Sequence, residues 1–262
     1  MPSWTPDWSD FQVFTNNIRT SLPWVHYSDS SRAPYFGFPN HYIASGNHKH
    51  RLYASDDQSI LQLGGIEIDQ VAQTIPFNGV GYSKEDFRQL FGSDICHIWD
   101  GAMPTAKSDD PKVLMRRLIE TTAAGQHRSS ESNDGQIIAD GLAYLRNLPL
   151  SLEGHRMEEN DSYQSHLQAG GNPEQYVNLA SNYSFSRAFI VSCRGKMGLG
   201  PSDTCVGDRI CILFGGGVPD VIRKQGTKRV LVGELYMEGV MNGEAIPLDD
   251  KSDLKEETFD FI

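Results

Sequence analysis

Residues 24–42 bring together side chains that suit the binding of an apolar molecule. Aromatic rings bury such a ligand and restrict its conformers, and a neutral imidazole or phenol can donate a hydrogen bond to an oxygen that gains charge. We expect the cavity wall to include Trp24, Tyr35, Phe36, Phe38 and Tyr42. The candidates for hydrogen bonding in catalysis are His26, His41 and Tyr35. The alternative, given even weight, is an arm that wraps the core and only buries its rings.

Other patterns that could bind a metal or a cofactor are incomplete. His48 and His50 would point to the same side of an extended segment, but no third ligand lies nearby in the sequence, and catalytic zinc sites use three. The glycines 215–217 are followed by Val218-Pro219, so the Lys-Ser/Thr pair and helix of a phosphate-binding loop are missing. We therefore expect no metal and no cofactor.

Two glutamates and four cysteines remain as chemically able groups. Glu234 and Glu244 each follow a glycine, and either could act as a general base, although the acceptance of backbone hydrogen bonds at a turn is favoured. No Gly-x-Ser-x-Gly nucleophile motif and no Cys-x-x-Cys pair occurs. Cys193 and Cys211 lie in predicted strands, so we expect them to be core residues.

The elements that must position these residues indicate an α+β fold. Apolar residues alternate in 59–75, where Gly64-Gly65 shifts the phase as a bulge would, and 42–45 is expected to form a partner strand. Short β-rich runs separated by glycine turns fill 183–246. Residues 43–75 and 183–246 are expected to share a bent antiparallel sheet or small β-barrel, ahead of a charged tail that ends on Phe259 and Phe261.

Helical signals fill the interval between the two sets of strands. Pro111 suits the first position of a helix, and a further apolar pattern over 136–148 stops at Pro149. We expect residues 83–170 to form a helical layer over the sheet. The elements then belong to a single domain, 1–262, whose first 42 residues are the aromatic segment.

Composition narrows the class of partner. The chain has 262 residues and a formal net charge of −11, which argues against a nucleic-acid duplex, because such surfaces need clustered Lys and Arg. No apolar run reaches the roughly 18–20 residues that span a bilayer, and the first ten residues do not have the features of a signal peptide. We expect a cytoplasmic protein with reduced thiols. The sequence does not indicate its oligomeric state.

Three stretches carry a resemblance to a known family. Residues 2–9, PSWTPDWS, are similar to a P-S-W-x-P-D-W segment of fungal heterokaryon-incompatibility (HET) proteins. The second stretch consists of Ala44-Ser-Gly and, further along, the L-x-L-x-G-x-x-x-D-x-V pattern of 61–71. The third runs from Arg187 to Ala245. The chain thus resembles the C-terminal region of HET proteins. Nothing in it matches the N-terminal HET domain, so the cell-death function of that domain is not implied.

The resemblance and the aromatic segment leave two functions open. The first is a cofactor-independent isomerase or cyclase, similar to a pericyclase, that acts on a bulky apolar small molecule in fungal natural-product biosynthesis. Such a reaction needs a shaped cavity and one or two hydrogen-bond donors rather than a nucleophile. The second is a non-catalytic regulatory or partner-binding module derived from a HET protein.

Overall fold

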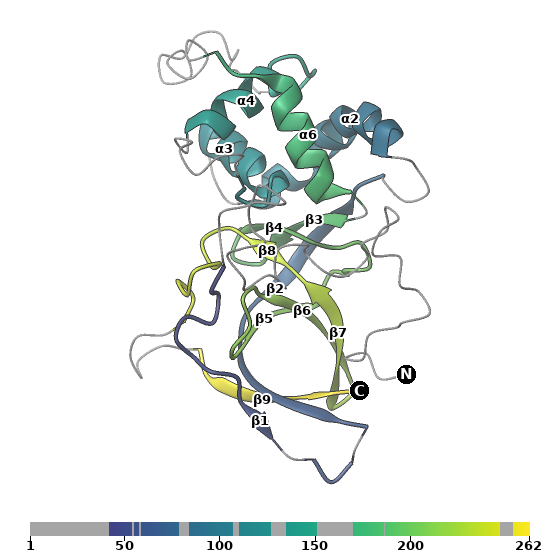
Figure 1. The fold of residues 1–262 in the computed structure, drawn as a ribbon. Coiled ribbons are helices and arrows are strands. Elements are labelled where there is room, and N and C mark those ends of the chain that lie inside the picture. Colours follow the sequence, from purple (N-terminus) through teal and green to yellow (C-terminus); the bar gives the residue numbers. More distant parts are fainter. Residues whose placement is uncertain are drawn as a thin grey trace.

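The computed structural model describes residues 42–53, 55–57, 59–78, 84–106, 110–126, 135–150, 170–185, 187–246 and 254–262. Helices gather at one end of the molecule, and strands build the other (Figure 1). In chain order the elements are β1 (Leu52–Tyr53), β2 (Leu61–Pro76), α2 (Lys84–Ala102), the short 3₁₀ helix η2 (Met103–Ala106), α3 (Pro111–Thr122), α4 (Gly135–Leu145), α6 (Pro173–Ser184), β3 (Arg187–Ser192), β4 (Met197–Pro201), β5 (Arg209–Leu213), β6 (Asp220–Gln225), β7 (Lys228–Glu234), β8 (Tyr236–Met237) and β9 (Glu256–Phe261).

The strand β2 organises the whole sheet. It is 16 residues long, and it pairs antiparallel with β5 and β9 over its first two thirds and with β3 near its end. Among the described residues the strands form one nine-stranded sheet in the order β5-β6-β7-β9-β2-β3-β4-β8, with β1 beside β2. The predicted α+β fold with a strongly bent sheet is therefore confirmed, and the early and late strands do share one sheet.

Five strands of the sheet close into a ring. The pairing continues from β2 to β5, β6, β7 and β9 and returns to β2, and the contact of β7 with β9 rests on the single parallel pair Arg229–Phe261. All five strands contribute to one apolar cluster that fills the ring: Leu61, Leu63, Cys211, Leu213, Ile222, Leu231, Phe259 and Phe261. Residues directly opposite each other on paired strands share a face, so the partners of these residues also face the interior.

The helices pack on β3 and β4, next to the ring. Asp110 caps α3 by accepting the backbone N–H of Lys112, and Asn172 caps α6 by accepting the N–H groups of Glu174 and Gln175. Each cap is followed by a proline, which suits the first turn. Helix residues such as Phe91 and Leu118 form one core with Phe189 of β3 and Leu199 of β4, so the helical layer and the sheet are packed together.

Three predictions about these elements are wrong in part. Residues 42–51 are not a strand: Ile43 and Ala44 donate backbone hydrogen bonds to the carbonyls of Met241 and Gly217, which lie in turns, and the sheet begins at Leu52. The helical layer continues past 170 through α6. Cys193 is exposed in the turn after β3, whereas Cys211 is buried as predicted.

Candidate functional site

Tyr42 is the one member of the predicted cavity wall that the structure describes. Its ring packs against the main core, and its hydroxyl donates a hydrogen bond of 2.5 Å to the carbonyl of Ala124. The other candidates, Trp24, His26, Tyr35, Phe36, Phe38 and His41, lie outside the described residues. Their roles stay predictions, and Tyr42 marks the place where the segment joins the fold.

The turn that receives Tyr42 has a constrained backbone. Helix α3 ends in a left-handed turn in which Ala124 has φ +49° and Gly125 has φ +65°. Ala124 is the only non-glycine residue with positive φ in the described part of the chain, and such strain persists only where the surroundings enforce it. The next residue, Gln126, is fully buried and donates from Nε2 to the Tyr42 hydroxyl at 2.6 Å.

Two further tyrosines complete a polar cluster between α3 and β8, which we call the tyrosine seam: Tyr42, Gln126, Tyr183 and Tyr236. The rings of Tyr42 and Tyr236 lie 6.0 Å apart, and a β-carbon at Gly125 would lie 2.9 Å from each of their hydroxyls. Burial raises the pKa of Tyr42, Tyr183 and Tyr236 above the usual value of a phenol. The hydroxyls therefore remain protonated throughout the physiological range.

The amide of Gln126 is only partly used by its described neighbours. Its side-chain oxygen Oε1 is buried and accepts no hydrogen bond from the part of the chain that the structure describes, although Nε2 of the same amide is bonded to Tyr42. A buried acceptor without a partner is uncommon and costs about 1–3 kcal/mol. The seam thus combines protonated phenol hydroxyls with an amide oxygen that can accept a hydrogen bond.

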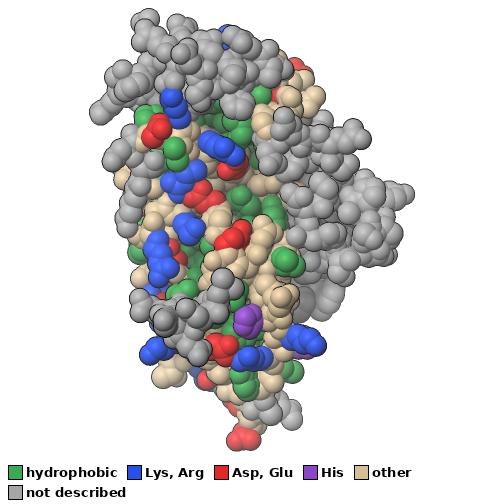
Figure 2. Space-filling model, turned by 90° about the vertical axis from the view of Figure 1, so that its left-hand side faces the viewer, with side chains coloured by type: hydrophobic (Ala, Val, Ile, Leu, Met, Phe, Trp, Pro, Cys, Tyr) green, Lys and Arg blue, Asp and Glu red, His purple; other side chains and the backbone are tan. Residues whose placement is uncertain are grey.

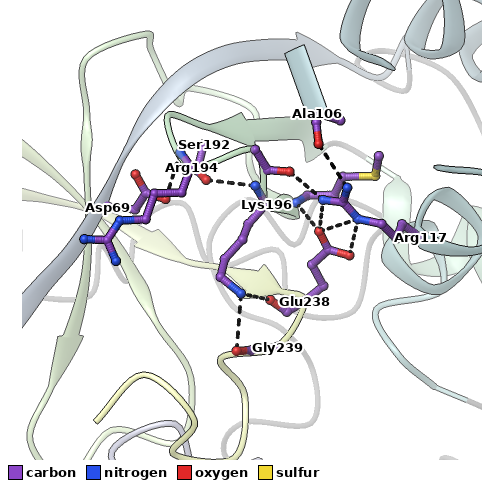
Figure 3. A network of polar contacts seen from close by, with 10 residues as sticks. Asp69, Ala106, Arg117, Ser192, Arg194, Lys196, Glu238 and Gly239 are labelled. Carbon is purple, nitrogen blue, oxygen red and sulfur yellow. Dashed lines mark hydrogen bonds and ion pairs between the residues drawn. The ribbon is translucent and has the colours of Figure 1, made fainter. Parts of the chain in front are cut away.

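A network of charged groups fixes the edge of the seam (Figure 3). Nε of Arg117, on α3, lies 2.8 Å from both carboxylate oxygens of Glu238, just after β8. The guanidinium also donates to the carbonyls of Ala106 and Gly195, and Glu238 accepts the backbone N–H of Met197 at 2.8 Å. These contacts join α3, η2 and the β3–β4 turn to the strand that carries Tyr236.

A second group of titratable residues lies on the inner face of the ring. Asp220 of β6 stands opposite Cys211 of β5 and Glu234 of β7, and Cys211 stands opposite Glu67 of β2. Burial, followed by the neighbouring Glu234 charge, raises the pKa of Asp220 well above its usual value. The sequence pointed to Glu234 but not to Asp220. The signal that could have identified Asp220 is its position among apolar residues at the start of a buried strand.

Other residues considered from the sequence have structural roles. Among the described residues no group of three His, Cys, Asp or Glu side chains is placed to hold a metal ion. The ring of His48 stacks on that of Phe214 at 4.9 Å, and the Arg51 guanidinium lies 5.0 Å from the centre of the Phe214 ring. His48 and Arg51 therefore pack against the core rather than only facing solvent. Glu244 accepts the backbone N–H of Asn242 at 2.6 Å, as expected at a turn.

The face of the molecule shown in Figure 2 carries no large patch of like-charged side chains among the described residues. Lys and Arg side chains there are interspersed with Asp and Glu rather than gathered into a stripe. This distribution does not resemble the basic surface that a nucleic-acid duplex requires. None of the helices in the described part of the chain combines the length and the apolar character needed to cross a bilayer.

The comparison with protein families agrees with the resemblance read from the sequence. A family model described as the Het-6 beta-barrel domain matches residues 152–255, so that part of the chain is similar to a HET-associated domain. The match contains β3 to β8, whereas β2 precedes it and β9 follows it. The ring is therefore completed by strands from outside the matched stretch. No curated protein and no solved structure shows a significant similarity to the chain.

Proposed function

We propose that this HET-like barrel protein binds a bulky, mostly apolar small molecule at the tyrosine seam and acts on it as a cofactor-independent isomerase or cyclase. The observation that carries the proposal is the cluster of protonated phenols around Gly125, beside a buried amide oxygen of Gln126 that accepts no hydrogen bond from the described residues. The substrate class and the reaction type are inferences from that chemistry. The predicted aromatic wall of 24–42 leads directly into Tyr42.

The chemistry needs only positioning and neutral hydrogen bonds. A phenol whose pKa is raised by burial keeps its proton, so the Tyr236 hydroxyl suits the stabilisation of charge that develops on a ligand oxygen. The Tyr42 hydroxyl would do the same by exchanging its bond to the Ala124 carbonyl for one to the ligand. Removal of one such donor typically lowers turnover by about 10²–10³. The Gln126 oxygen would accept a hydrogen bond from the same ligand and fix its orientation.

The test compares two buried tyrosines. Tyr42→Phe removes a seam hydroxyl, and Tyr176→Phe removes a hydroxyl that bonds Thr122 at 2.7 Å inside the helical layer. Tyr42→Phe should cost about 1–3 kcal/mol of stability, because it deletes two hydrogen bonds, one to the Ala124 carbonyl and one from Gln126, and Tyr176→Phe should cost about 1 kcal/mol, because it deletes one. Only Tyr42→Phe should lower turnover, or weaken the thermal shift, with a panel of terpene and polyketide scaffolds. Trp24→Ala and Tyr35→Ala should act like Tyr42→Phe if the aromatic segment lines the cavity.

The competing function is the non-catalytic regulatory or partner-binding module. It is favoured by three exposed apolar side chains close together in sequence, Ile43, Leu52 and Tyr53, which are 54%, 65% and 43% exposed. If no scaffold of the panel changes the melting temperature or is converted, and both Tyr→Phe variants alter stability alone, the isomerase proposal is wrong. The module is then the better account.

A further inference from the structure

The interior of the ring holds a carboxyl pair that the proposed function does not use. Asp220 and Glu234 are direct partners on β6 and β7, and Asp220 is 8% exposed. Their neighbours in the ladder are Cys211, which faces Asp220 from β5, and Glu67, which faces Cys211 from β2. The inner face therefore carries three acidic side chains and one thiol in a row across four adjacent strands.

Positive charges are distributed unevenly around this row. Glu67 lies 3.0 Å from a guanidinium nitrogen of Arg209 and 3.5 Å from the ammonium of Lys224, so its charge is balanced locally. Beside Glu234 lies Arg187, the first residue of β3, which is 3% exposed. Burial lowers the pKa of Arg187 to about 10, and the charge of the nearby Glu234 opposes that shift, so the guanidinium stays charged at neutral pH.

The count of buried charges then decides the state of Asp220. One guanidinium and one carboxylate neutralise each other, and a second carboxylate would leave a net buried negative charge. Such a charge is costly, and two neighbouring carboxyl groups commonly keep one proton. Burial first, and then the fields of neighbouring carboxylates such as Glu67 and Glu257, raise the pKa of Cys211, with Arg229 acting against them.

We propose that Asp220, Glu234 and Arg187 form a proton-binding site in which Asp220 carries a proton and shares it with Glu234. Loss of this proton forces β6 and β7 apart at their paired ends. The backbone is already irregular there: the β6–β7 register shifts between Val221 and Ile222. The next hydrogen bond along, from the N–H of Leu235 to the carbonyl of Pro219 at 2.9 Å, is the first to weaken.

The site is also placed to control the tyrosine seam. Glu234 ends β7, and Tyr236 begins β8 two residues later, so a movement of the β6–β7 ends is passed to Tyr236 along the chain. The proton site itself does not depend on the proposed ligand or reaction, and its test needs neither. Failure of the isomerase proposal therefore leaves this inference intact, and the reverse also holds.

The sign of the pH effect follows from linkage. An unfolded aspartate titrates near about 3.9, whereas the pKa of folded Asp220 is raised. The stability that comes from the protonated form is complete below the unfolded value and is lost as pH rises through the folded value. Above that range the free energy of unfolding stays lowered by a constant amount. Asp220→Asn should remove this loss, because asparagine has nearly the same shape as aspartate and stays neutral.

Thermal unfolding of the full chain as a function of pH tests the site. Asp220→Asn should raise the melting temperature near pH 8, on the order of 2–4 °C for a chain of this size, and the gain should shrink toward acid pH. Asp208→Asn is the matched control, since Asp208 is equally buried but lies 2.7 Å from the Arg223 guanidinium. That variant should melt lower than the native chain at neutral pH.

Hydrogen exchange gives a second measurement that does not depend on the size of the melting shift. The amide of Leu235 should exchange faster in the native chain than in Asp220→Asn at pH 8, with the difference closing at acid pH. If Asp220→Asn melts lower than the native chain at pH 8, the folded protein is stabilised by an ionised Asp220 and the proposal is wrong. If Leu235 exchanges equally in both at pH 8, the protonation state of Asp220 does not control the β6–β7 ends, and the proposal is wrong as well. Should Asp220→Asn not fold at all, an Asp220 carboxyl that titrates at or below 3.9 by carbon-13 NMR of the native chain overturns it equally.

Discussion

Two adjacent arginines of α3 form ion pairs whose contributions to stability should differ, because one pair is mostly buried and the other is more exposed. Arg117 and Glu238 are each 17% exposed and bind through two carboxylate oxygens, and the arginine also bonds two carbonyls. Arg116 pairs with Glu120 one turn along the same helix, but its side chain is 61% exposed. The first contact joins four elements of the fold, and the second joins only neighbouring turns.

Arg117→Met should therefore destabilise the protein far more than Arg116→Met. Removing one partner of a buried pair leaves the other charge uncompensated and costs about 3 kcal/mol or more, whereas an exposed i,i+4 pair contributes about 0.3–0.5 kcal/mol. Urea unfolding of both variants measures the difference. Equal losses would mean that the network of Figure 3 does not hold the seam together.

At the same scale, the sequence revealed the kinds of residue but not their partners. Tyr42 was singled out for its place in an aromatic run, yet its contacts with Ala124 and Gln126 span more than eighty positions and leave no local pattern. Asp220 lies in an apolar strand, and its effect depends on Glu234 and Arg187 arriving from other strands. Pairings of this kind are set by topology, which local propensity does not encode.

Among the elements, glycines misled the sequence reading in an informative way. The glycines of 183–246 are predicted to form turns between strands, but two of them, Gly198 and Gly200, lie inside β4. A β-carbon at Gly198 would lie 2.8 Å from the Tyr236 carbonyl, and one at Gly200 would lie 2.6 Å from a side-chain atom of Ile190. Here glycine permits close packing of strands rather than a turn, and a sequence shows no difference between these two uses.

The same reasoning applies to Gly64-Gly65, where a bulge was predicted. The structure continues β2 through both residues and places the register shifts later, after Glu67 and after Val71. A β-carbon at Gly65 would lie 2.5 Å from the Ile212 carbonyl, so the pair allows β5 to approach β2 closely. The bend of the sheet is real, but its irregularities lie elsewhere in the strand.

Gly65→Ala should consequently cost about 1–3 kcal/mol, because its clash is with backbone that cannot move without breaking the β2–β5 pairing. Gly64→Ala is a control one residue away: its nearest contacts are side-chain atoms of Arg51 and Phe214, at 3.0 and 3.2 Å. The Arg51 atom is its Cβ and moves with the backbone, but both contacts are at 3.0 Å or more and need only small shifts, so we expect a loss of about 1 kcal/mol, smaller than that of Gly65→Ala. Denaturant unfolding measures both values, and a larger loss for Gly64→Ala would contradict the close-approach explanation.

Other elements escaped prediction because their signals were weak in isolation. Helix α6 has a clear start at Asn172-Pro173, but it falls between the predicted helical layer, which ended at 170, and the predicted β-rich run from 183, so no element was predicted for most of it. Strand β9 was taken for a charged tail, since Glu256, Glu257 and Asp260 alternate with only two buried rings. The broad reading of the fold was nevertheless sound, because long apolar patterns survive such local errors.

For the molecule as a whole, closure of the ring depends on distant parts of the chain. Strand β9 lies at the C-terminus and pairs along the start of β2, some two hundred positions earlier. The matched HET-associated stretch ends at 255, immediately before β9. A ring completed in this way has many contacts between residues far apart in sequence, and such topologies fold slowly.

Two phenylalanine side chains of β9 stabilise the closed ring of strands. Phe259 and Phe261 are each 1% exposed and lie in the cluster that also contains the buried thiol of Cys211. Replacing either ring by alanine should cost about 3–5 kcal/mol. It should also open the ring interior, so that Cys211 reacts faster with a thiol reagent in a chain whose other three cysteines are replaced by serine.

Thr258→Ala separates loss of packing from loss of the strand itself. Thr258 is exposed, comes directly before Phe259 and points to the opposite face of β9, so its replacement keeps the β2 pairing and removes no buried group. The rate of Cys211 modification should stay at its original value in this variant and rise in Phe259→Ala and Phe261→Ala. If all three variants react alike, the interior is reached without opening β9, and the closed ring is not what shields the thiol.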